Sequence, residues 1–234
     1  MLTRIARTAL VAGAVAGILT WGAHQLRAVP LILQAETYEQ AAEDTPAANA
    51  PAEHAHAAQA DSHADSPWRR LALGFLTSAL VGIGYGFVLV GAIVLSGRSV
   101  DWRLGALWGL AGFVAFAAAP ALGLPPELPG MSAAPVGARQ AWWLATAAAT
   151  AGGLAALVFG AKIPWRAAGI VLMVLPHLVG APRIALESGP LPAELAAEFA
   201  VVALVTSAMF WLALGATAGH LLGRSESSPQ PETA

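Results

Sequence analysis

The sequence predicts an all-α, polytopic membrane protein: a bundle of six transmembrane helices, or five if the first apolar run is a cleaved signal peptide. Of the 234 residues, 57% are hydrophobic and only 11% are charged, whereas soluble domains carry roughly 25% charged residues. Six apolar runs are long enough, or nearly so, to cross a hydrocarbon core that needs about 20 apolar residues. These runs are 8–26, 71–95, 104–124, 141–161, 163–179 and 195–222.

Composition excludes several classes of function. The sequence has no Cys, so thiolate metal sites and thiol catalysis are not available to it. A net charge of −2 disfavours a polyanionic partner such as nucleic acid. Neither a nucleotide-binding P-loop nor an H-E-x-x-H zinc motif occurs. We do not expect an enzyme, because an intramembrane hydrolase would need Ser78 or Ser207 beside His177 as a nucleophile and base.

The apolar runs divide the chain into four parts. Residues 1–33 contain the first span, and 34–67 form a periplasmic loop rich in Ala, Pro, His and acidic residues, which we expect to be largely disordered. Residues 68–223 form the remaining five helices, and 224–234 form a disordered cytoplasmic tail. The bundle therefore needs no second folded domain.

The second half of the chain shows a weak internal similarity between two segments of its sequence. Trp102-Arg103 opens one span and Trp165-Arg166 opens another, and each span leads to a Pro-x-Glu or Pro-Glu turn and a long Ala-rich span. One interpretation is a repeat of two helical hairpins in the same orientation, as is common in transporters. The other is that such turns are simply good helix breaks at a membrane surface.

Basic residues predict the orientation. Arg4 and Arg7 precede the first span, so the positive-inside rule places both termini in the cytoplasm. The acidic residues sort independently of that rule: of the fourteen Asp and Glu residues, only Asp101, Glu226 and Glu232 fall on the cytoplasmic side. The other acids and the His-containing loop therefore share the outer face. Such an arrangement is typical of a protein that collects a cation before passing it inward.

The polar loop holds the first candidate metal ligands. His54 and His56 are separated by one residue, and His63 follows among carboxylates. Imidazole suits Co, Ni, Zn and Cu. Because binding needs neutral imidazole, capture should weaken as the pH falls towards about 6. The alternative is a solvated linker in which these histidines are incidental.

Further candidate ligands lie at the predicted outer ends of the spans. Glu127 stands in a Leu-Pro-Pro-Glu-Leu-Pro-Gly run, whose prolines end the helix and hold it on a stiff turn. His177 lies in a short span interrupted by Pro and Gly, on the same helix face as Met173. Glu194 and Glu198 are one turn apart at the start of the last span. The bland alternatives are a helix cap for Glu127, a carbonyl hydrogen bond for His177 and a helix-dipole contact for Glu194.

Glycine spacing predicts where helices meet. Pairs of glycines four residues apart allow close helix approach in membranes. The pairs are Gly13 and Gly17, Gly105 and Gly109, and Gly215 and Gly219.

In the order of its motifs the chain resembles the CbtA family of proposed cobalt transporter subunits. The most specific matching runs are 124–130 (Leu-Pro-Pro-Glu-Leu-Pro-Gly) and 176–182 (Pro-His-Leu-Val-Gly-Ala-Pro), and the resemblance covers roughly 1–223. It implies a bacterial inner-membrane protein linked to cobalt uptake for cobalamin. It also implies a small, single-span, His-containing partner, CbtB. The resemblance brings no ligand set, so the candidate ligands rest on position and chemistry.

Together these features predict a membrane subunit of a divalent-cation importer, for Co²⁺ first and for Ni²⁺ or Zn²⁺ as alternatives. The ion is the substrate, and no permanently bound cofactor is expected. The loop histidines would concentrate the ion, and Glu127, His177 and Glu198 would form the site that receives it. The rival interpretation is a non-transporting scaffold or accessory protein for a small single-span partner. A homo-oligomer is left open.

Overall fold

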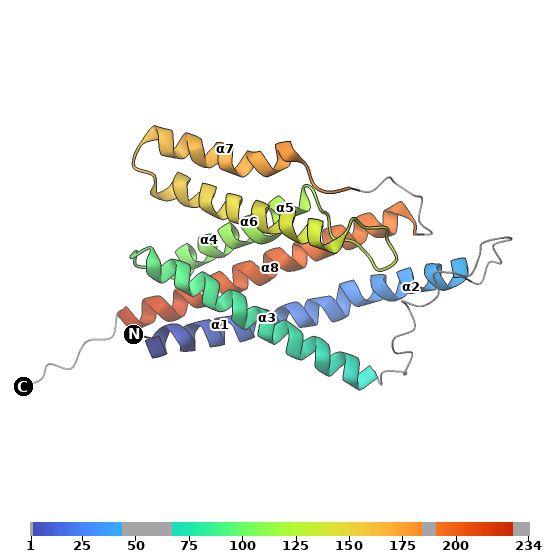
Figure 1. The fold of residues 1–234 in the computed structure, drawn as a ribbon. Coiled ribbons are helices and arrows are strands. Elements are labelled where there is room, and N and C mark those ends of the chain that lie inside the picture. Colours follow the sequence, from blue (N-terminus) through green and yellow to red (C-terminus); the bar gives the residue numbers. More distant parts are fainter. Residues whose placement is uncertain (1, 44–66, 184–190, 227–234) are drawn as a thin grey trace, which may run out of the picture.

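The computed structural model describes residues 2–43, 67–183 and 191–226, and every regular element in these ranges is helical. The long helical segments lie side by side, and the chain reverses direction from each segment to the next (Figure 1). In chain order they are α1 (Leu2–Ala23), the π-helical turn η1 (His24–Ala28), α2 (Val29–Glu43), α3 (Pro67–Leu95), α4 (Trp102–Phe113), the π-helical turn η2 (Val114–Ala118), α5 (Ala119–Ala121), α6 (Val136–Phe159), α7 (Ile163–Val179) and α8 (Ala193–Glu226).

The described helices confirm the predicted membrane bundle. Five segments are long and apolar enough to span a membrane: Leu2–Ala41, Trp68–Leu95, Trp102–Ala121, Val136–Phe159 and Ala193–Arg224. The sixth apolar run forms α7, which has 17 residues. At 1.5 Å per residue α7 is about 25 Å long, shorter than a hydrocarbon core of about 30 Å.

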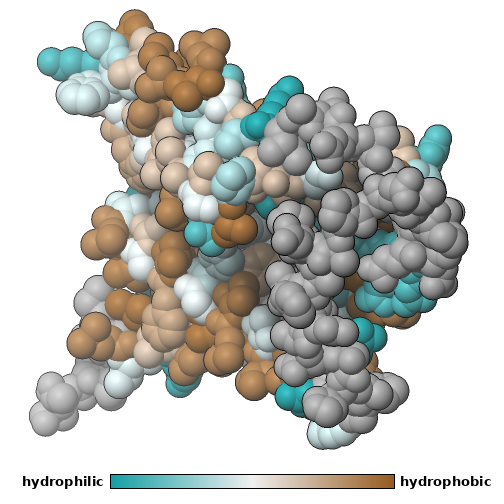
Figure 2. Space-filling view, turned by 45° about the vertical axis from the view of Figure 1, so that its right-hand side comes forward, coloured by the Kyte–Doolittle hydropathy of each residue, from teal (hydrophilic) through white to brown (hydrophobic). Residues whose placement is uncertain are grey.

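The surface of the bundle is apolar, as lipid contact requires. Figure 2 shows hydrophobic side chains spread over the helix faces in view. On α7, for example, Ile163 is 82% exposed and Leu178 and Val179 are each 77% exposed. Apolar side chains at this exposure are costly in water and favourable in hydrocarbon.

The bundle has two distinct ends (Figure 1). At the terminal end, α1 begins and α8 finishes, and the Arg4 guanidinium donates a hydrogen bond to the Leu222 carbonyl. At the loop end lie α2, the loop 122–135 and the start of α8. These two names are used below.

A proline follows each of the two π-helical turns and is accommodated within the helix. Pro30 follows η1 and Pro120 follows η2, each by two residues. In each wide turn a backbone N–H reaches back five residues, from Val29 to the His24 carbonyl and from Ala119 to the Val114 carbonyl. The proline then falls where the hydrogen-bond ladder has already shifted, so its missing donor is tolerated. The first helix therefore continues through Pro30 to Glu43, well beyond the predicted end of the first span at residue 26.

Close backbone contacts join the helices in pairs. Where α1 crosses α3, a Cβ added to Gly13 would lie 2.5 Å from the Gly82 carbonyl oxygen. Where α4 crosses α8, a Cβ added to Gly215 would lie 2.7 Å from the Gly109 nitrogen and would meet the Gly105 carbonyl. All six glycines singled out in the sequence lie at such contacts, so the predicted helix-packing positions are confirmed.

Aromatic rings fill the centre of the bundle between these pairs. Trp211 of α8 is only 3% exposed and stacks on Phe116 of η2 with ring centroids 5.4 Å apart. Tyr85 of α3 meets Trp211 edge-on at 5.0 Å. Ring pairs of this geometry favour one orientation beyond their buried area. They therefore fix the π-helical turn of the α4 span against α8.

The two hairpins predicted in the second half correspond to α4 with α6 and to α7 with α8, and they pack against each other. α4 and α7 run in one direction, and α6 and α8 run in the other (Figure 1). α4 packs on α8 while α7 packs on α6, so the first helix of each hairpin contacts the second helix of the other. The arrangement suits two hairpins of the same orientation, and common descent as a repeat stays a prediction.

We expect Gly215→Ala to lower the free energy of unfolding by about 1–3 kcal/mol, the usual cost of an overpacked contact, because its Cβ meets backbone atoms of α4. Gly84→Ala is the matched control, since a Cβ there meets nothing within 4 Å; it should leave stability unchanged or raise it by up to about 1 kcal/mol. Thermal unfolding in detergent measures both. Equal stability of the two variants would contradict the packing role of Gly215.

Candidate functional site

At the loop end, α2 extends past the neighbouring helices and covers the loop 122–135 (Figure 1). Ala35 of α2 is fully buried in a cluster with Leu128 of the loop and Leu195 of α8. One turn further along α2, the Glu39 carboxylate lies over Gly130, whose φ of +80° belongs to the left-handed region. A side chain at Gly130 would be strained and would also collide with Glu39. The loop is thus held in place beneath α2.

The proline run places Glu127 beside the start of α6. α5 ends at Ala121, as the prolines predicted, because Pro125 and Pro126 offer no backbone donors. Glu127 follows directly, and its Oε2 accepts a hydrogen bond of 2.6 Å from an Arg139 terminal nitrogen in the first turns of α6. The two side chains are 22% and 31% exposed, respectively. Charge-assisted bonds of this length are strong, so the Glu127 charge is locally compensated by Arg139.

The ion pair borders a cavity of about 740 Å³ between η2, α5, α6 and α8. Most of its wall is apolar and aromatic, including Phe116 and Trp143. Gln140 of α6 and Ser207 of α8 add uncharged polar groups. Apart from the pair itself, no charged residue lines this cavity in the described part of the chain.

His177 lies near the end of α7 and packs against α6. Its ring is 5.8 Å from the Trp142 ring in an edge-to-face arrangement. The Trp142 indole nitrogen donates a hydrogen bond of 3.2 Å to the Pro176 carbonyl. Gly180, at φ +85°, then ends the helix. The Trp142 contact therefore fixes the position of the imidazole at the loop end of α7.

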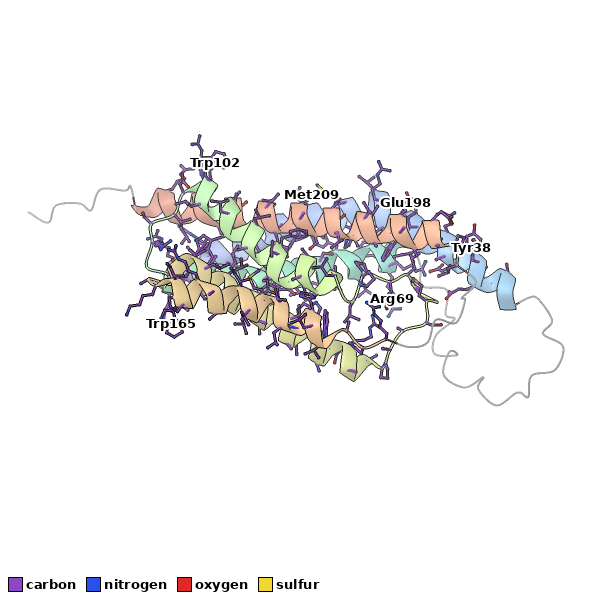
Figure 3. The ribbon with its side chains drawn as sticks, turned by 90° about the horizontal axis from the view of Figure 1, so that it is seen from above. Tyr38, Arg69, Trp102, Trp165, Glu198 and Met209 are labelled. Carbon is purple, nitrogen blue, oxygen red and sulfur yellow. The ribbon has the colours of Figure 1, made fainter. Side chains whose placement is uncertain are left out.

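Glu194 and Glu198 occupy the first two turns of α8, and both are exposed. Figure 3 shows Glu198 projecting from α8 away from the other helices. Two like charges one turn apart repel mildly, and solvent at this end screens them. Glu194 also gains from the helix N-terminus.

The structure does not bring the candidate ligands into one cluster. Among the residues it describes, no three His, Asp or Glu side chains lie close enough to hold a metal ion. Glu127 is paired with Arg139, His177 contacts Trp142, and Glu198 points outward. His54, His56 and His63 fall outside the described residues. The metal-binding roles of all these residues stay predictions.

Three features escaped the sequence-based interpretation. Arg139 is the partner of Glu127, and the only hint was opposite charge on either side of a proline-rich loop. His24 begins a π-helical turn inside the first span, and such turns often mark functional positions. Thr146 and Thr150 of α6 are fully buried with unpaired hydroxyls. Their four-residue spacing within an Ala-rich span was the available signal.

The chain matches a known protein family. A family model described as "Probable cobalt transporter subunit (CbtA)" matches residues 2–223. No curated protein and no solved structure matches the chain.

We expect the Glu127–Arg139 pair to show energetic coupling in a double-mutant cycle. Glu127→Gln and Arg139→Gln should each destabilise the protein by leaving a partly buried charge without its partner, and the double variant should recover part of the loss. A coupling energy of about 0.5–3 kcal/mol is expected for residues in direct contact. The free energy of unfolding in mixed micelles is measured for the parent, the two single variants and the double variant. Strict additivity would mean that the pair is incidental.

Proposed function

The chain belongs to the CbtA family, whose members are described as probable cobalt transporter subunits. We propose that it carries Co²⁺ across the bacterial inner membrane and collects it at the loop end. Five long apolar helices support a multi-pass membrane protein. The loop end would face the periplasm, and both termini would lie in the cytoplasm.

The observation that best supports this proposal is the uneven distribution of acidic and basic residues between the two ends of the bundle. The carboxylates described towards the loop end belong to Glu36, Glu39, Glu127, Glu194 and Glu198, and they share that end with the basic residues Arg27, Arg69, Arg70, Arg139 and Arg183. The terminal end is mostly basic, with Asp101 as the exception whose side chain caps α4. Its basic residues are Arg4, Arg7, Arg98, Arg103, Lys162, Arg166 and Arg224. The excess of basic residues at the terminal end favours the cytoplasm, and the carboxylates at the other end offer oxygen ligands to a cation.

The segment linking α2 to α3 would strengthen this collection. α2 ends and α3 begins at the loop end (Figure 1), and the sequence between them carries His54, His56 and His63. Neutral imidazoles bind Co²⁺, Ni²⁺ and Zn²⁺, so these residues would capture the ion when it is scarce. Capture would weaken below about pH 6 as the imidazoles become protonated.

Glu127 would receive the ion by exchanging partners. In this conformation its carboxylate is bound to Arg139, so an incoming cation competes with a guanidinium. The ion would displace Arg139 and enter the region of the adjoining cavity. His177, Glu194 and Glu198 stand at the same end and would supply further nitrogen and oxygen ligands as the helix ends move. Co²⁺ accepts mixed ligands of this kind.

The imported cobalt would supply cobalamin synthesis, and a small single-span subunit would complete the transporter. Both proposals rest on the family rather than on a described contact. The exposed apolar faces of the bundle leave room for such a helix, for lipid or for a second copy of this chain.

A non-transporting scaffold is the second candidate. It is favoured by the absence of a three-ligand cluster among the described residues and by the commitment of Glu127 to Arg139. In a scaffold these acids would only solvate the loop end. The two functions differ in how cobalt uptake responds to the substitutions below.

Arg139→Gln and Glu127→Gln should affect cobalt uptake in opposite directions. Removing the guanidinium frees the carboxylate and should lower the Co²⁺ concentration that gives half-maximal uptake. Removing the carboxylate should raise that concentration several-fold. Radioactive cobalt accumulation in cells that express the variant with its partner subunit measures both, with protein level as the control. Parallel loss in the two variants would assign the pair a purely structural role.

Replacing His54, His56 and His63 together by Asn should reduce uptake at low cobalt and leave uptake at saturating cobalt unchanged, because only capture is impaired. The matched control replaces Asn49, Gln59 and Ser62 of the same segment by Ala. Initial rates over a range of cobalt concentrations distinguish the two cases. Identical curves for both triple variants would make the histidines incidental.

A further inference from the structure

The cavity beside Glu127 opens sideways, towards the membrane. Its walls come from η2, α5, α6 and α8, and among the described elements α6 and α8 do not pack on each other. Along this gap α6 presents Val136, Gln140 and Leu144, which are one helical turn apart. Val136 is 64% exposed and Leu144 is 61% exposed, so this rim is largely uncovered in the described structure. In a bilayer such an apolar rim meets lipid.

The cavity reaches about as deep as one lipid leaflet. Its rim on α6 covers about 12 Å, at 1.5 Å per residue, and half of a hydrocarbon core is about 15 Å. At the inner end, Phe116 of η2 lies against Trp143 of α6 with ring centroids 6.1 Å apart, and both rings line the cavity. At the loop end, the lining includes Glu127 and Arg139. The cavity is therefore mostly apolar and carries its charge at the level of lipid headgroups.

Arg139 can bind a second anion at this level. A guanidinium offers five N–H donors, and one terminal nitrogen of Arg139 bonds the Glu127 carboxylate. In the described part of the chain, the Arg139 side chain makes no other hydrogen bond. The side chain is 31% exposed, so its remaining donors are accessible. Arginine suits phosphate in particular, because two parallel N–H donors match two phosphate oxygens.

We propose that this cavity binds one phospholipid from the leaflet at the loop end, with an acyl chain in the apolar part and the phosphate on Arg139. The cavity volume of about 740 Å³ lies within the range of about 300–1,000 Å³ that is usual for small-molecule sites. A helix of a partner protein is too large. With side chains it is about 10–12 Å across, so a length of about 12 Å would occupy roughly 900 Å³ or more.

A bound phosphate acts on the proposed cation site. It shares the guanidinium with Glu127, so the carboxylate is held less strongly, and it adds negative charge beside that carboxylate. Both effects favour a cation at Glu127. By linkage, a cation at Glu127 strengthens phospholipid binding by the same factor. This coupling rests on the proposed role of Glu127 in import, whereas the lipid site itself does not.

The test uses the full-length protein, freed of lipid in a maltoside detergent. The probe is palmitoyl-oleoyl-phosphatidylethanolamine. Palmitoyl-oleoyl-glycerol has the same chains without the phosphate, and glycerol phosphate has the phosphate without the chains. Native mass spectrometry gives the Kd of each compound, and thermal unfolding gives the lipid-dependent rise in Tm.

Two substitutions address the two parts of the site. Ala203→Trp fills the cavity from α8, and its matched control is Val201→Trp, two residues away on the same helix and 62% exposed. Arg139→Gln removes the phosphate contact. Its control is Arg103→Gln, because the Arg103 guanidinium lies over Trp102 at the terminal end, away from the cavity.

We expect the phospholipid to bind the parent about tenfold more tightly than the diacylglycerol, as one charge-assisted hydrogen bond provides, and glycerol phosphate to bind more weakly than either. Ala203→Trp and Arg139→Gln should each lose about tenfold in phospholipid affinity together with the rise in Tm. Both control variants should behave like the parent.

Equal affinity of the parent for the phospholipid and the diacylglycerol overturns the site, and this comparison needs no variant to fold. Unchanged phospholipid binding in folded Arg139→Gln or in folded Ala203→Trp also overturns it. The cavity would then hold only the surrounding lipid.

The coupling is measured as the Kd of CoCl₂ with and without saturating phospholipid, after His54, His56 and His63 are replaced by Asn to remove capture outside the membrane. The phospholipid should tighten cobalt binding about fivefold, and Glu127→Gln should abolish this effect. A cobalt Kd that ignores the lipid overturns the coupling and leaves cobalt import standing. Absence of cobalt binding under both conditions counts against the proposed function and leaves the lipid site standing.

Discussion

Close backbone contact between helices is the constraint on which the rest of this structure depends. In hydrocarbon, apolar side chains gain little from one another compared with lipid, so association relies on packing and polar contacts. Glycines meet the requirement where α1 crosses α3, where α4 crosses α8 and where α6 crosses α7. The α4–α8 contact holds η2 against Trp211, and the α6–α7 contact holds His177 against Trp142.

The distribution of polar groups follows from the same solvent. Charged side chains are expensive in the bilayer, so they gather at the two ends, and the acidic majority occupies the loop end. Within the described spans, polar function must then rely on uncharged groups: hydroxyls, a thioether, an imidazole and the carbonyls freed by proline. In the cavity beside Glu127, uncharged polar groups of this kind come from Gln140 and Ser207.

Much of the fold was predictable from the sequence, because the span of an apolar run and the spacing of glycines are local properties. The continuation of the first helix through Pro30 was not predictable, because the sequence around a proline does not indicate that a π-helical turn precedes it. The candidate site was harder for a different reason. The topology of the spans predicts which residues lie at the loop end, but it does not predict which side chains pair there. The ion pair between Glu127 and Arg139 depends on how an irregular loop folds back on α6. The sequence also could not show that Thr146 and Thr150 are buried in the bundle rather than exposed to lipid.

Sidedness is the central claim, and the absence of Cys permits a direct measurement on an otherwise native chain. Single cysteines are introduced at Ala133 in the loop 122–135 and at Ala161 in the turn between α6 and α7, both exposed positions at opposite ends. A membrane-impermeant maleimide is then applied to intact cells whose outer membrane has been opened. The account predicts labelling of Ala133→Cys, and labelling of Ala161→Cys only after lysis. Labelling of Ala161→Cys alone in intact cells would place the loop end in the cytoplasm and contradict collection of cobalt from outside.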